Sequence, residues 1–199
     1  MGDLEIILAS GSPRRRELLK GLGWNFQVLV PEIDESPRAG ELPKELCVRL
    51  AATKAHAADS DENSLVVAAD TIVVVDGDVL GKPVNEDESL RMIRRLQGRV
   101  HEVLTGVGIR WKKRMSTGLE RTRVRFRPLD DAAARAYVET GEGRDKAGAY
   151  AIQGRGSLLV SSIEGDYFNV VGLPLCRLGT MIEEMGLNLP CQWGVEAQR

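Results

Sequence analysis

The order of apolar and polar positions along the chain predicts strands and helices that interleave. Two apolar runs, 5–9 and LVVAADTIVVV at 65–75, indicate buried strands, and VDGDV after the second run predicts a hairpin. In RTRVRFRPL, the alternation places Val124 and Phe126 on one face of a strand and arginines on the other. Further strands are expected at 26–33, 100–109, 157–163 and 167–172.

Helices are predicted between these strands by apolar residues at helical spacing and by signals at the helix ends. Ser12 and Pro13 favour one helix start, and Asn85 with Glu88 three residues later favours another, which Gly98 ends. The remaining helices are expected at 42–58, 130–143 and 173–186. Alternation of strands and helices predicts an α/β fold with a mixed sheet flanked by helices.

The composition excludes several classes of function. A formal net charge of −2 over 199 residues, with 5% aromatic residues, is unlike that of a general nucleic-acid binder. The longest apolar runs, such as LVVAA, are too short to span a membrane, and the acidic start MGDLEIILAS is unlike a signal peptide. Three cysteines without a CxxC pair support neither a disulfide framework nor a thiolate metal site. We therefore expect one domain, residues 1–199, in the cytoplasm, with neither nucleic acid nor membrane as a partner.

The first candidate for chemistry is the predicted helix start with three arginines, Arg14, Arg15 and Arg16. A helix N-terminus already carries about half a positive charge, so cations are normally disfavoured there. Two interpretations remain open. The arginines form either a solvated basic turn or an anion site, in which backbone N–H groups of residues 11, 12 and 14 and one or two guanidiniums clamp a phosphate. A turn between a strand and a helix is where α/β folds place such sites.

Four further charged residues are candidates for the same site. Asp70 and Glu35 each follow an apolar strand segment, which would place their carboxylates at the edge of the sheet as ligands of a divalent metal. For Asp70 the alternative is an N-cap or turn role. Lys54 lies on the apolar side of its predicted helix and either points into a cleft or extends its ammonium group to solvent. Lys82 follows the hairpin and could reach that cleft, where lysines, an arginine and a metal would suit phosphoryl transfer.

Eight motifs, in order along the chain, resemble those of the Maf proteins. They are SGSPRRRELL, the acid of IDE, LAATKA, AADTIV, LGKP, GRVHEVLTGV, GEGRDKAGAYAIQG and NVVGLPL. The resemblance covers about residues 6–180, which is nearly the whole chain. Maf proteins are nucleoside triphosphate pyrophosphatases that were first described as inhibitors of septum formation.

The resemblance implies a two-lobed α/β fold related to the inosine triphosphate pyrophosphatases, with a cleft between the lobes and frequent homodimers. It also implies hydrolysis of a nucleoside triphosphate to the monophosphate and pyrophosphate, with Mg²⁺ or Mn²⁺. By similarity, Asp70 is the proton acceptor and Glu35 the metal-side carboxylate, and both would hold the metal. The residues that resemble phosphate and substrate contacts are Ser10, Arg14, Arg15, Lys54 and Lys82. The catalytic residues that the resemblance implies are Asp70, Glu35 and Lys82.

Within the family, the chain resembles the subgroup that hydrolyses dTTP and UTP. Arg14, Thr71 and Gln153 match the specificity positions of that subgroup, and a glutamine amide offers both donors and an acceptor to the imide edge of uracil or thymine. Three alternatives remain open: a 7-methyl-GTP pyrophosphatase, an enzyme for modified pyrimidine triphosphates, and a nucleotide-sensing regulator of division with incidental catalysis. Nucleotide house-cleaning and arrest of septum formation are both compatible with the sequence.

Overall fold

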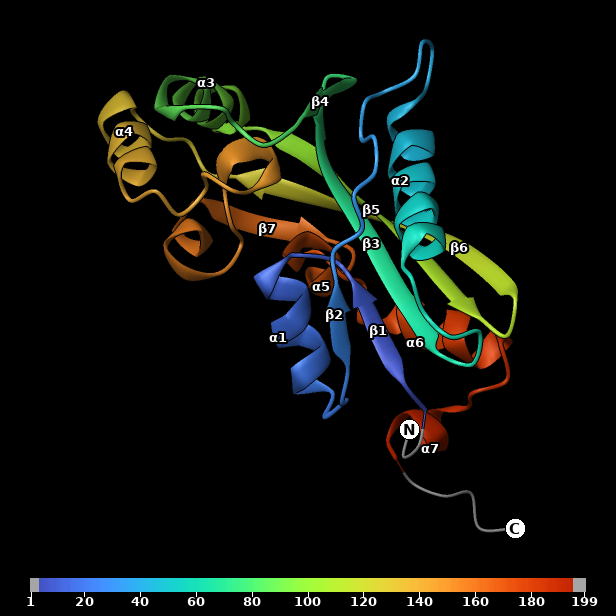
Figure 1. The fold of residues 1–199 in the computed structure, drawn as a ribbon. Helices are drawn as coiled ribbons and strands as arrows, with labels where there is room; N and C mark the ends of the chain where they lie inside the picture. The colour runs from blue at the N-terminus through green and yellow to red at the C-terminus, as the bar shows by residue number, and fades with distance from the viewer. Residues whose placement is uncertain (1–3, 195–199) are drawn as a thin grey trace. The chain divides into compact units, whose positions relative to one another are not determined.

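The computed structural model describes residues 4–194 (Figure 1). The strands are β1 (Ile6–Ala9), β2 (Gln27–Leu29), β3 (Leu65–Val75), β4 (Asp78–Leu80), β5 (Val100–Trp111), β6 (Arg114–Phe126) and β7 (Val160–Glu164). The α-helices are α1 (Pro13–Gly21), α2 (Pro43–Ala57), α3 (Glu86–Leu96), α4 (Asp131–Glu139), α5 (Tyr167–Val171), α6 (Leu175–Glu184) and α7 (Leu189–Gln192). The 3₁₀ segments η1 (Ala147–Ala149) and η2 (Gly154–Leu158) lie between α4 and β7 in the chain.

The strands form a mixed sheet in the order β2-β1-β3-β5-β6-β7, with β4 paired to β3. β1 runs parallel to β2 and to β3, whereas β4 runs antiparallel to β3 and β7 runs antiparallel to β6. The prediction of an α/β fold with a mixed sheet is therefore confirmed.

The chain divides into two compact units. Unit 1 comprises Met1–Asp70, Thr105–Glu120 and Gly172–Arg199, and unit 2 comprises Thr71–Leu104 and Arg121–Val171. The assignment of residues 1–199 to a single two-lobed domain with a cleft stays a prediction. Within residues 4–194, no helix combines the length and the apolar composition that crossing a membrane requires.

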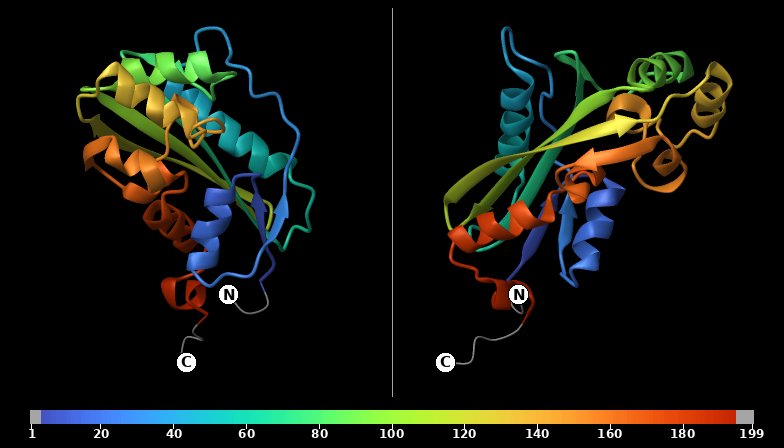
Figure 2. Two further views of the ribbon diagram at one scale, coloured as in Figure 1. Left: turned by 90° about the vertical axis from the view of Figure 1, so that its left-hand side faces the viewer. Right: turned by 180° about the vertical axis from the view of Figure 1, so that it is seen from behind.

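Unit 1 has helices on both faces of its strands (Figure 2). One apolar cluster packs α1 and α6 against strand residues such as Ile6 and Val67. On the opposite face, neighbouring strand residues such as Ile7 and Val66 pack with Ala55 of α2. Because successive side chains of a strand point to opposite faces, strands that are apolar at every position suit a sheet that is covered on both sides.

Two glycines of β5, Gly106 and Gly108, allow α2 to pack close to the strand. A Cβ atom at Gly106 would lie 2.3 Å from the carbonyl oxygen of Cys47, and one at Gly108 would lie 2.7 Å from that of Ala51. Both neighbours are backbone atoms of α2, so a larger residue would push the helix away from the strand. The glycines thus fix the distance between β5 and the helix that carries Lys54.

Unit 2 packs α3 and α4 onto its strands. Leu96 of α3 and Tyr137 of α4 belong to one apolar cluster together with Val124 and Phe126 of β6. The arginines that alternate with these residues on β6 are exposed, as the sequence pattern predicts. One face of β6 in this unit therefore meets the core, and the other carries charge.

Local sequence signals are confirmed at the hairpin and at the start of α3. Asp76 (φ 53°) and Gly77 (φ 85°) form the two-residue connection between β3 and β4. Positive φ at both positions is what a tight hairpin of this type requires. Asn85 caps α3, because its side chain accepts a hydrogen bond of 2.9 Å from the backbone N–H of Glu88.

The strand predicted at 167–172 is wrong, because Tyr167–Val171 forms the short helix α5. The side chain of Asp166 accepts a hydrogen bond of 2.8 Å from the backbone N–H of Phe168, as an N-terminal cap does. Asn169 is fully buried, and its amide donates to the carbonyl oxygen of Val103 and to the hydroxyl of Thr122. The β-branched content of YFNVVG predicted a strand, but these side-chain hydrogen bonds favour a helical turn.

Two other predicted strands are shorter than expected. The segment predicted as a strand at 26–33 pairs only over Gln27–Leu29, and Pro31 has no N–H group with which to extend the pairing. Glu35 therefore lies in the loop after β2 and not at a strand end. In the segment 157–163, the first residues belong to η2, and β7 begins at Val160.

Candidate active site

The candidate site residues of unit 1 gather where the parallel strands β1 and β2 end. Ser10 follows directly after β1, whereas Asp70 lies inside the longer strand β3. The parallel register pairs Leu8 with Val67, and two residues further along it brings Ser10 level with Ala69. Asp70 is therefore neither a turn residue nor an N-cap, and both alternatives for it are wrong. The carboxyl ends of parallel strands are where α/β proteins bind their ligands.

Lys54 of α2 joins the two carboxylates of the site. Its Nζ lies 2.6 Å from Oδ1 of Asp70 and 2.6 Å from Oε1 of Glu35. The side chains of Lys54 and Asp70 are 13% and 12% exposed, whereas that of Glu35 is 58% exposed. The alternative in which Lys54 extends to solvent is therefore wrong. The lysine instead neutralises a nearly buried aspartate, which would otherwise be costly to keep ionised.

The loop that carries Glu35 is held by Arg49 of α2. The guanidinium donates a hydrogen bond of 3.0 Å to the carbonyl oxygen of Ser36. It also binds the carboxylate of Glu41 with both Nε and Nη2. Hydrogen bonding from Arg49 lowers the pKa of Glu41 to about 2. A two-point contact between a guanidinium and a carboxylate is specific in geometry, so it orders a loop that has no strand partner.

Arg15 and Ser10 form a second, buried group in unit 1. Nη1 of Arg15 donates to Ser10 Oγ (2.9 Å) and to the carbonyl oxygen of Ala69 (2.8 Å), and its Nε donates to the carbonyl oxygen of Gly172 (2.8 Å). Burial lowers the pKa of Arg15, and the charge of Asp70 opposes this shift. Ser10 Oγ also accepts from the backbone N–H of Ser12 at 3.3 Å. Arg15 thus links the start of α1 to the residue that precedes Asp70.

The three arginines at the start of α1 have different environments. Arg14 is partly exposed and forms an ion pair of 2.9 Å with Glu17 one turn later on the helix. Arg15 is buried, and Arg16 donates 3.3 Å to the carbonyl oxygen of Gly11. Ser12 stands at the predicted N-cap position, but its side chain makes no capping hydrogen bond. The solvated-turn interpretation is therefore wrong for Arg15, which is buried and contacts the candidate site residue Ser10.

Cys47 contacts the backbone of the candidate site residue Asp70, and the sequence patterns did not indicate it. Its thiol donates a hydrogen bond of 2.9 Å to the carbonyl oxygen of Asp70, and its Sγ accepts one of 2.8 Å from the backbone N–H of Gly106. Burial raises the pKa of Cys47 to about 12, so the thiol keeps its proton at neutral pH and can donate it. The pair of glycines two residues apart in GVG was a usable signal, because both must lie on one face of a strand.

The donor set of unit 1 suits a hard divalent cation. Because Asp70 Oδ1 and Glu35 Oε1 each lie 2.6 Å from the same nitrogen, the two oxygens are at most twice that distance apart. Two carboxylates completed by phosphate oxygens and water are a usual set for Mg²⁺, and Mn²⁺ accepts the same donors. Within residues 4–194, no three His, Cys, Asp or Glu side chains come together as metal ligands. A cation would therefore take its remaining ligands from substrate and water.

The other three predicted site residues belong to unit 2. Thr71 follows Asp70 on β3 and is partly buried, Lys82 is exposed just after β4, and Gln153 is partly buried at the N-cap position of η2. Lys82 interacts electrostatically with Asp145. Their roles in a common site with the unit 1 residues stay a prediction.

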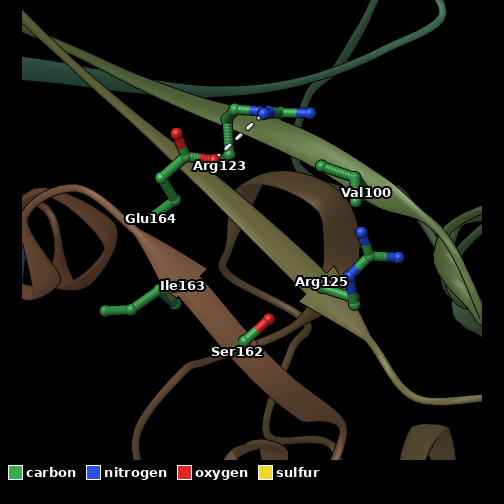
Figure 3. A pocket seen from close by; sticks show the side chains of 6 residues that line it. All are labelled: Val100, Arg123, Arg125, Ser162, Ile163 and Glu164. Atoms are coloured by element: carbon green, nitrogen blue, oxygen red, sulfur yellow. Dashed lines mark hydrogen bonds and ion pairs between the residues drawn. The ribbon is translucent and has the colours of Figure 1, made fainter.

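Unit 2 also has a shallow surface recess, which Figure 3 shows from close by. It is lined by Val100, Arg123, Arg125, Ser162, Ile163 and Glu164. Arg123 and Glu164 in its wall form an ion pair of 3.0 Å, so part of the positive charge is already neutralised. None of the predicted site residues lines it, and we assign it no function.

Comparisons with known proteins agree with the motifs of the chain. The family described as Maf-like protein matches residues 5–185. A dTTP/UTP pyrophosphatase of Pelotomaculum thermopropionicum is 49% identical over 93% of this chain and 98% of its own length. A dTTP/UTP pyrophosphatase of Symbiobacterium thermophilum is 51% identical over 92% of this chain and 94% of its own length.

Similarity to solved structures is weaker. The nucleoside-triphosphatase/dITP/XTP pyrophosphatase of Mycobacterium abscessus is 15% identical and covers 63% of this chain and 76% of its own, with a TM-score of 0.40. The family assignment therefore depends on the sequence relatives and on the family match.

Proposed function

The chain belongs to the Maf-like protein family, and from this premise we propose that it is a nucleoside triphosphate pyrophosphatase that hydrolyses dTTP and UTP. The products are the nucleoside monophosphate and pyrophosphate. The observation that carries the proposal is the contact of Lys54 with both Asp70 and Glu35, beside Ser10 and Arg15 at the ends of parallel strands. The choice of dTTP and UTP as substrates is supported by the names of relatives that are 49% and 51% identical.

Asp70 acts as the proton acceptor in this proposal. Its Oδ1 accepts from Lys54, so we assign the proton of the attacking water to Oδ2. The water oxygen forms a bond to the α-phosphorus, and the bond from that phosphorus to the bridging oxygen breaks as pyrophosphate leaves. Lys54 forms an ion pair with Asp70 and so fixes the orientation of the carboxylate.

Ser10, Arg15 and Lys82 act on the phosphates. Ser10 Oγ already accepts two hydrogen bonds, from Arg15 and from the N–H of Ser12, so the hydroxyl proton is what Ser10 can offer to a ligand. A phosphate oxygen, which only accepts, suits such a donor. Arg15 holds Ser10 in place and adds positive charge, and Lys82 neutralises the departing pyrophosphate.

A divalent metal, Mg²⁺ or Mn²⁺, completes the charge balance. Arg15 and Lys54 together offset the charges of Asp70 and Glu35, so this group offers no surplus of positive charge to a triphosphate. Glu35 and Asp70 are the residues that would hold the metal, consistent with the oxygen donors they bring together. When bound, the metal polarises phosphoryl oxygens and stabilises the charge that develops on them.

The base is selected by Thr71, Gln153 and Arg14 in this proposal. Gln153 offers a carbonyl acceptor and an amide donor, which match the N–H and the carbonyl groups of a uracil or thymine imide edge. Cytosine has an acceptor at N3 in place of that N–H, so a carboxamide held in the same orientation would lose this hydrogen bond, which is a strong source of discrimination.

A substrate panel tests the proposal. The purified chain is incubated with dTTP, UTP, CTP, dITP and 7-methyl-GTP at saturating Mg²⁺ or Mn²⁺, and phosphate and pyrophosphate are resolved as products. We expect the highest kcat/KM for dTTP and UTP, with pyrophosphate as the product. A best rate on 7-methyl-GTP, or release of inorganic phosphate, would refute it. Tight dTTP binding with negligible turnover would instead favour the regulator.

A further inference from the structure

The segment that presents Gln153, residues 151–156, is folded tightly in unit 2. Gln153 stands at the N-cap position of η2 in an extended conformation (φ −89°, ψ 166°). Ala151 and Gly156 on either side of it are buried, whereas Gln153 itself is partly buried. The backbone around Gln153 is therefore fixed by its neighbours.

The carboxylate of Glu142 binds the backbone after Gln153. Oε1 accepts a hydrogen bond of 2.9 Å from the N–H of Arg155, and Oε2 accepts one of 2.8 Å from the N–H of Gly156. These N–H groups belong to the first turn of η2, so no preceding carbonyl group of η2 can accept their hydrogen bonds. Glu142 thus does for η2 from a distance what a capping side chain does for a helix.

Tyr137 extends this contact to the backbone before Gln153. Its hydroxyl donates a hydrogen bond of 3.1 Å to Oε2 of Glu142 and accepts one of 3.1 Å from the N–H of Ala151. The Tyr137 side chain is itself buried in the unit 2 core, so the hydroxyl has a fixed position. Hydrogen bonds therefore hold the segment two residues before Gln153 and two residues after it.

Glycines allow the segment to close around the carboxylate. A Cβ at Gly154, where φ is +65°, would lie 2.3 Å from Oε1 of Glu142. A Cβ at Gly156 would lie 2.0 Å from the carbonyl oxygen of Ala151 and 2.8 Å from the hydroxyl of Tyr137. Both positions therefore need glycine, which accounts for the two glycines in the sequence QGRG after Ile152.

The ionised form of Glu142 is the one that fits. Burial raises the pKa of Glu142, but hydrogen bonds from Arg155, Gly156 and Tyr137 outweigh that effect and leave it below its ordinary value. A carboxylate only accepts hydrogen bonds, and all three of these neighbours donate. A glutamine at position 142 would turn an amide N–H₂ group toward one of the donors.

We propose that Glu142, acting with Tyr137, is a positioning residue for base selection: it fixes the backbone on both sides of Gln153 and so fixes where the carboxamide meets the base. The inference rests on the proposed function, which assigns Gln153 to the base. Glu142 touches backbone and Tyr137 and has no part in the chemistry of the phosphates. Its removal should therefore change which base is accepted more than how fast pyrophosphate leaves.

The test compares kcat and KM for UTP and CTP in Glu142→Gln, Tyr137→Phe and Gln153→Ala. We expect each variant to lower the ratio of kcat/KM for UTP over CTP by about tenfold, the size of one lost hydrogen bond. The loss should appear mainly in KM for UTP. Tyr137→Phe keeps the ring and its packing, so it provides the measurement if Glu142→Gln fails to fold. Glu139→Gln, the same change at an exposed residue nearby, is the matched control and should leave the ratio unchanged.

A double variant separates positioning from general damage. Because Glu142 acts through Gln153, Glu142→Gln combined with Gln153→Ala should lower the ratio no further than Gln153→Ala alone. Multiplied effects, or equal losses on UTP and CTP in a folded Glu142→Gln, would overturn the positioning role and leave the proposed function intact. A wild-type chain that hydrolyses neither UTP nor dTTP would overturn both.

Discussion

Unit 1 and unit 2 organise their candidate site residues in different ways. In unit 1, charged side chains on regular elements contact one another, as Lys54 of α2 does with Asp70 of β3. In unit 2, Gln153 stands in a loop whose backbone is held from outside by Glu142 and Tyr137. Ion pairs hold Lys54 with the two carboxylates, whereas hydrogen bonds to backbone hold the segment that presents Gln153.

This difference suits two different tasks. Phosphates are the same in every nucleoside triphosphate, so charges at fixed positions serve all substrates equally. Bases differ in the direction of their donors and acceptors, so a glutamine that reads them must be placed accurately by its backbone. Changes at Asp70 and Lys54 should therefore lower turnover for every substrate, and changes around Gln153 should alter the choice among them.

The largest effect is expected for Asp70→Asn, which keeps the shape and removes the proton acceptor. We expect kcat for UTP to fall by about 10²- to 10⁴-fold, the usual contribution of a general base. Steady-state release of pyrophosphate measures it, with folding checked by circular dichroism. Asp59→Asn, at an exposed position of unit 1, is the control. Turnover that stays within twofold of the wild type in folded Asp70→Asn would contradict the assignment.

Next in size is Gly106→Ala, which tests how closely α2 must approach β5. The new methyl group would meet backbone atoms of Cys47, which cannot rotate away, so we expect the free energy of unfolding to fall by about 3 kcal/mol. Urea denaturation measures the change. Gly21→Ala, where the added Cβ meets nothing within 4 Å, is the matched control. A variant as stable as the wild type would show that α2 can move without penalty.

A smaller, pH-dependent effect is expected in unit 2 from His101. This side chain is 1% exposed, its Nε2 lies 2.7 Å from the hydroxyl of Tyr150, and burial lowers its pKa from 6.5 to about 4. Between these two values the unfolded chain binds a proton that the folded chain does not, so stability rises with pH in that window. We expect a loss of about 2 kcal/mol in the free energy of unfolding from pH 7 to pH 5.

Two variants isolate this contribution. His101→Asn removes the titrating group and should flatten the pH dependence between pH 5 and 7, whatever its effect on overall stability. His56→Asn changes the other histidine, which is exposed, and should leave the dependence as it is. Equal slopes for His101→Asn and the wild type in urea denaturation would show that the buried histidine does not cause the loss.

The smallest effect is expected for Arg14→Ala. Its ion pair with Glu17 is between partly exposed groups, so its loss should change the free energy of unfolding by less than about 0.5 kcal/mol. If Arg14 contributes to base selection as proposed, the ratio of kcat/KM for UTP over CTP should fall by a few-fold. An unchanged ratio would confine base selection to unit 2. Lys20→Ala, on the same helix and exposed, is the control.

Much of the fold and part of the site could be predicted from sequence. Local signals act over a few residues, so the elements that they begin or connect were found. These signals are Pro13, Asn85 with Glu88, and Asp76 with Gly77. The helix α5 was missed because it depends on hydrogen bonds of Asn169 to residues far away in the chain. No local pattern contains such contacts.

The same reason separates the candidate site residues that sequence patterns indicate from those that they do not. Asp70 and Lys54 stand out as charges in apolar segments, so they could be found one by one. Cys47 and Glu142 act on the backbone of distant segments, through Gly106 and Gly156. Such contacts exist only once the chain has folded, although the glycines that permit them are visible in the sequence.

One comparison of two variants tests the central claim most directly: kcat/KM for UTP and for CTP in Lys54→Met and in Gln153→Ala. We expect Lys54→Met to lower both values by about a hundredfold or more and to leave their ratio within twofold. We expect Gln153→Ala to lower the ratio by about tenfold while kcat for UTP changes much less. A changed ratio in Lys54→Met, or equal losses on both substrates in Gln153→Ala, would contradict the division of tasks between the charged group around Lys54 and the segment around Gln153.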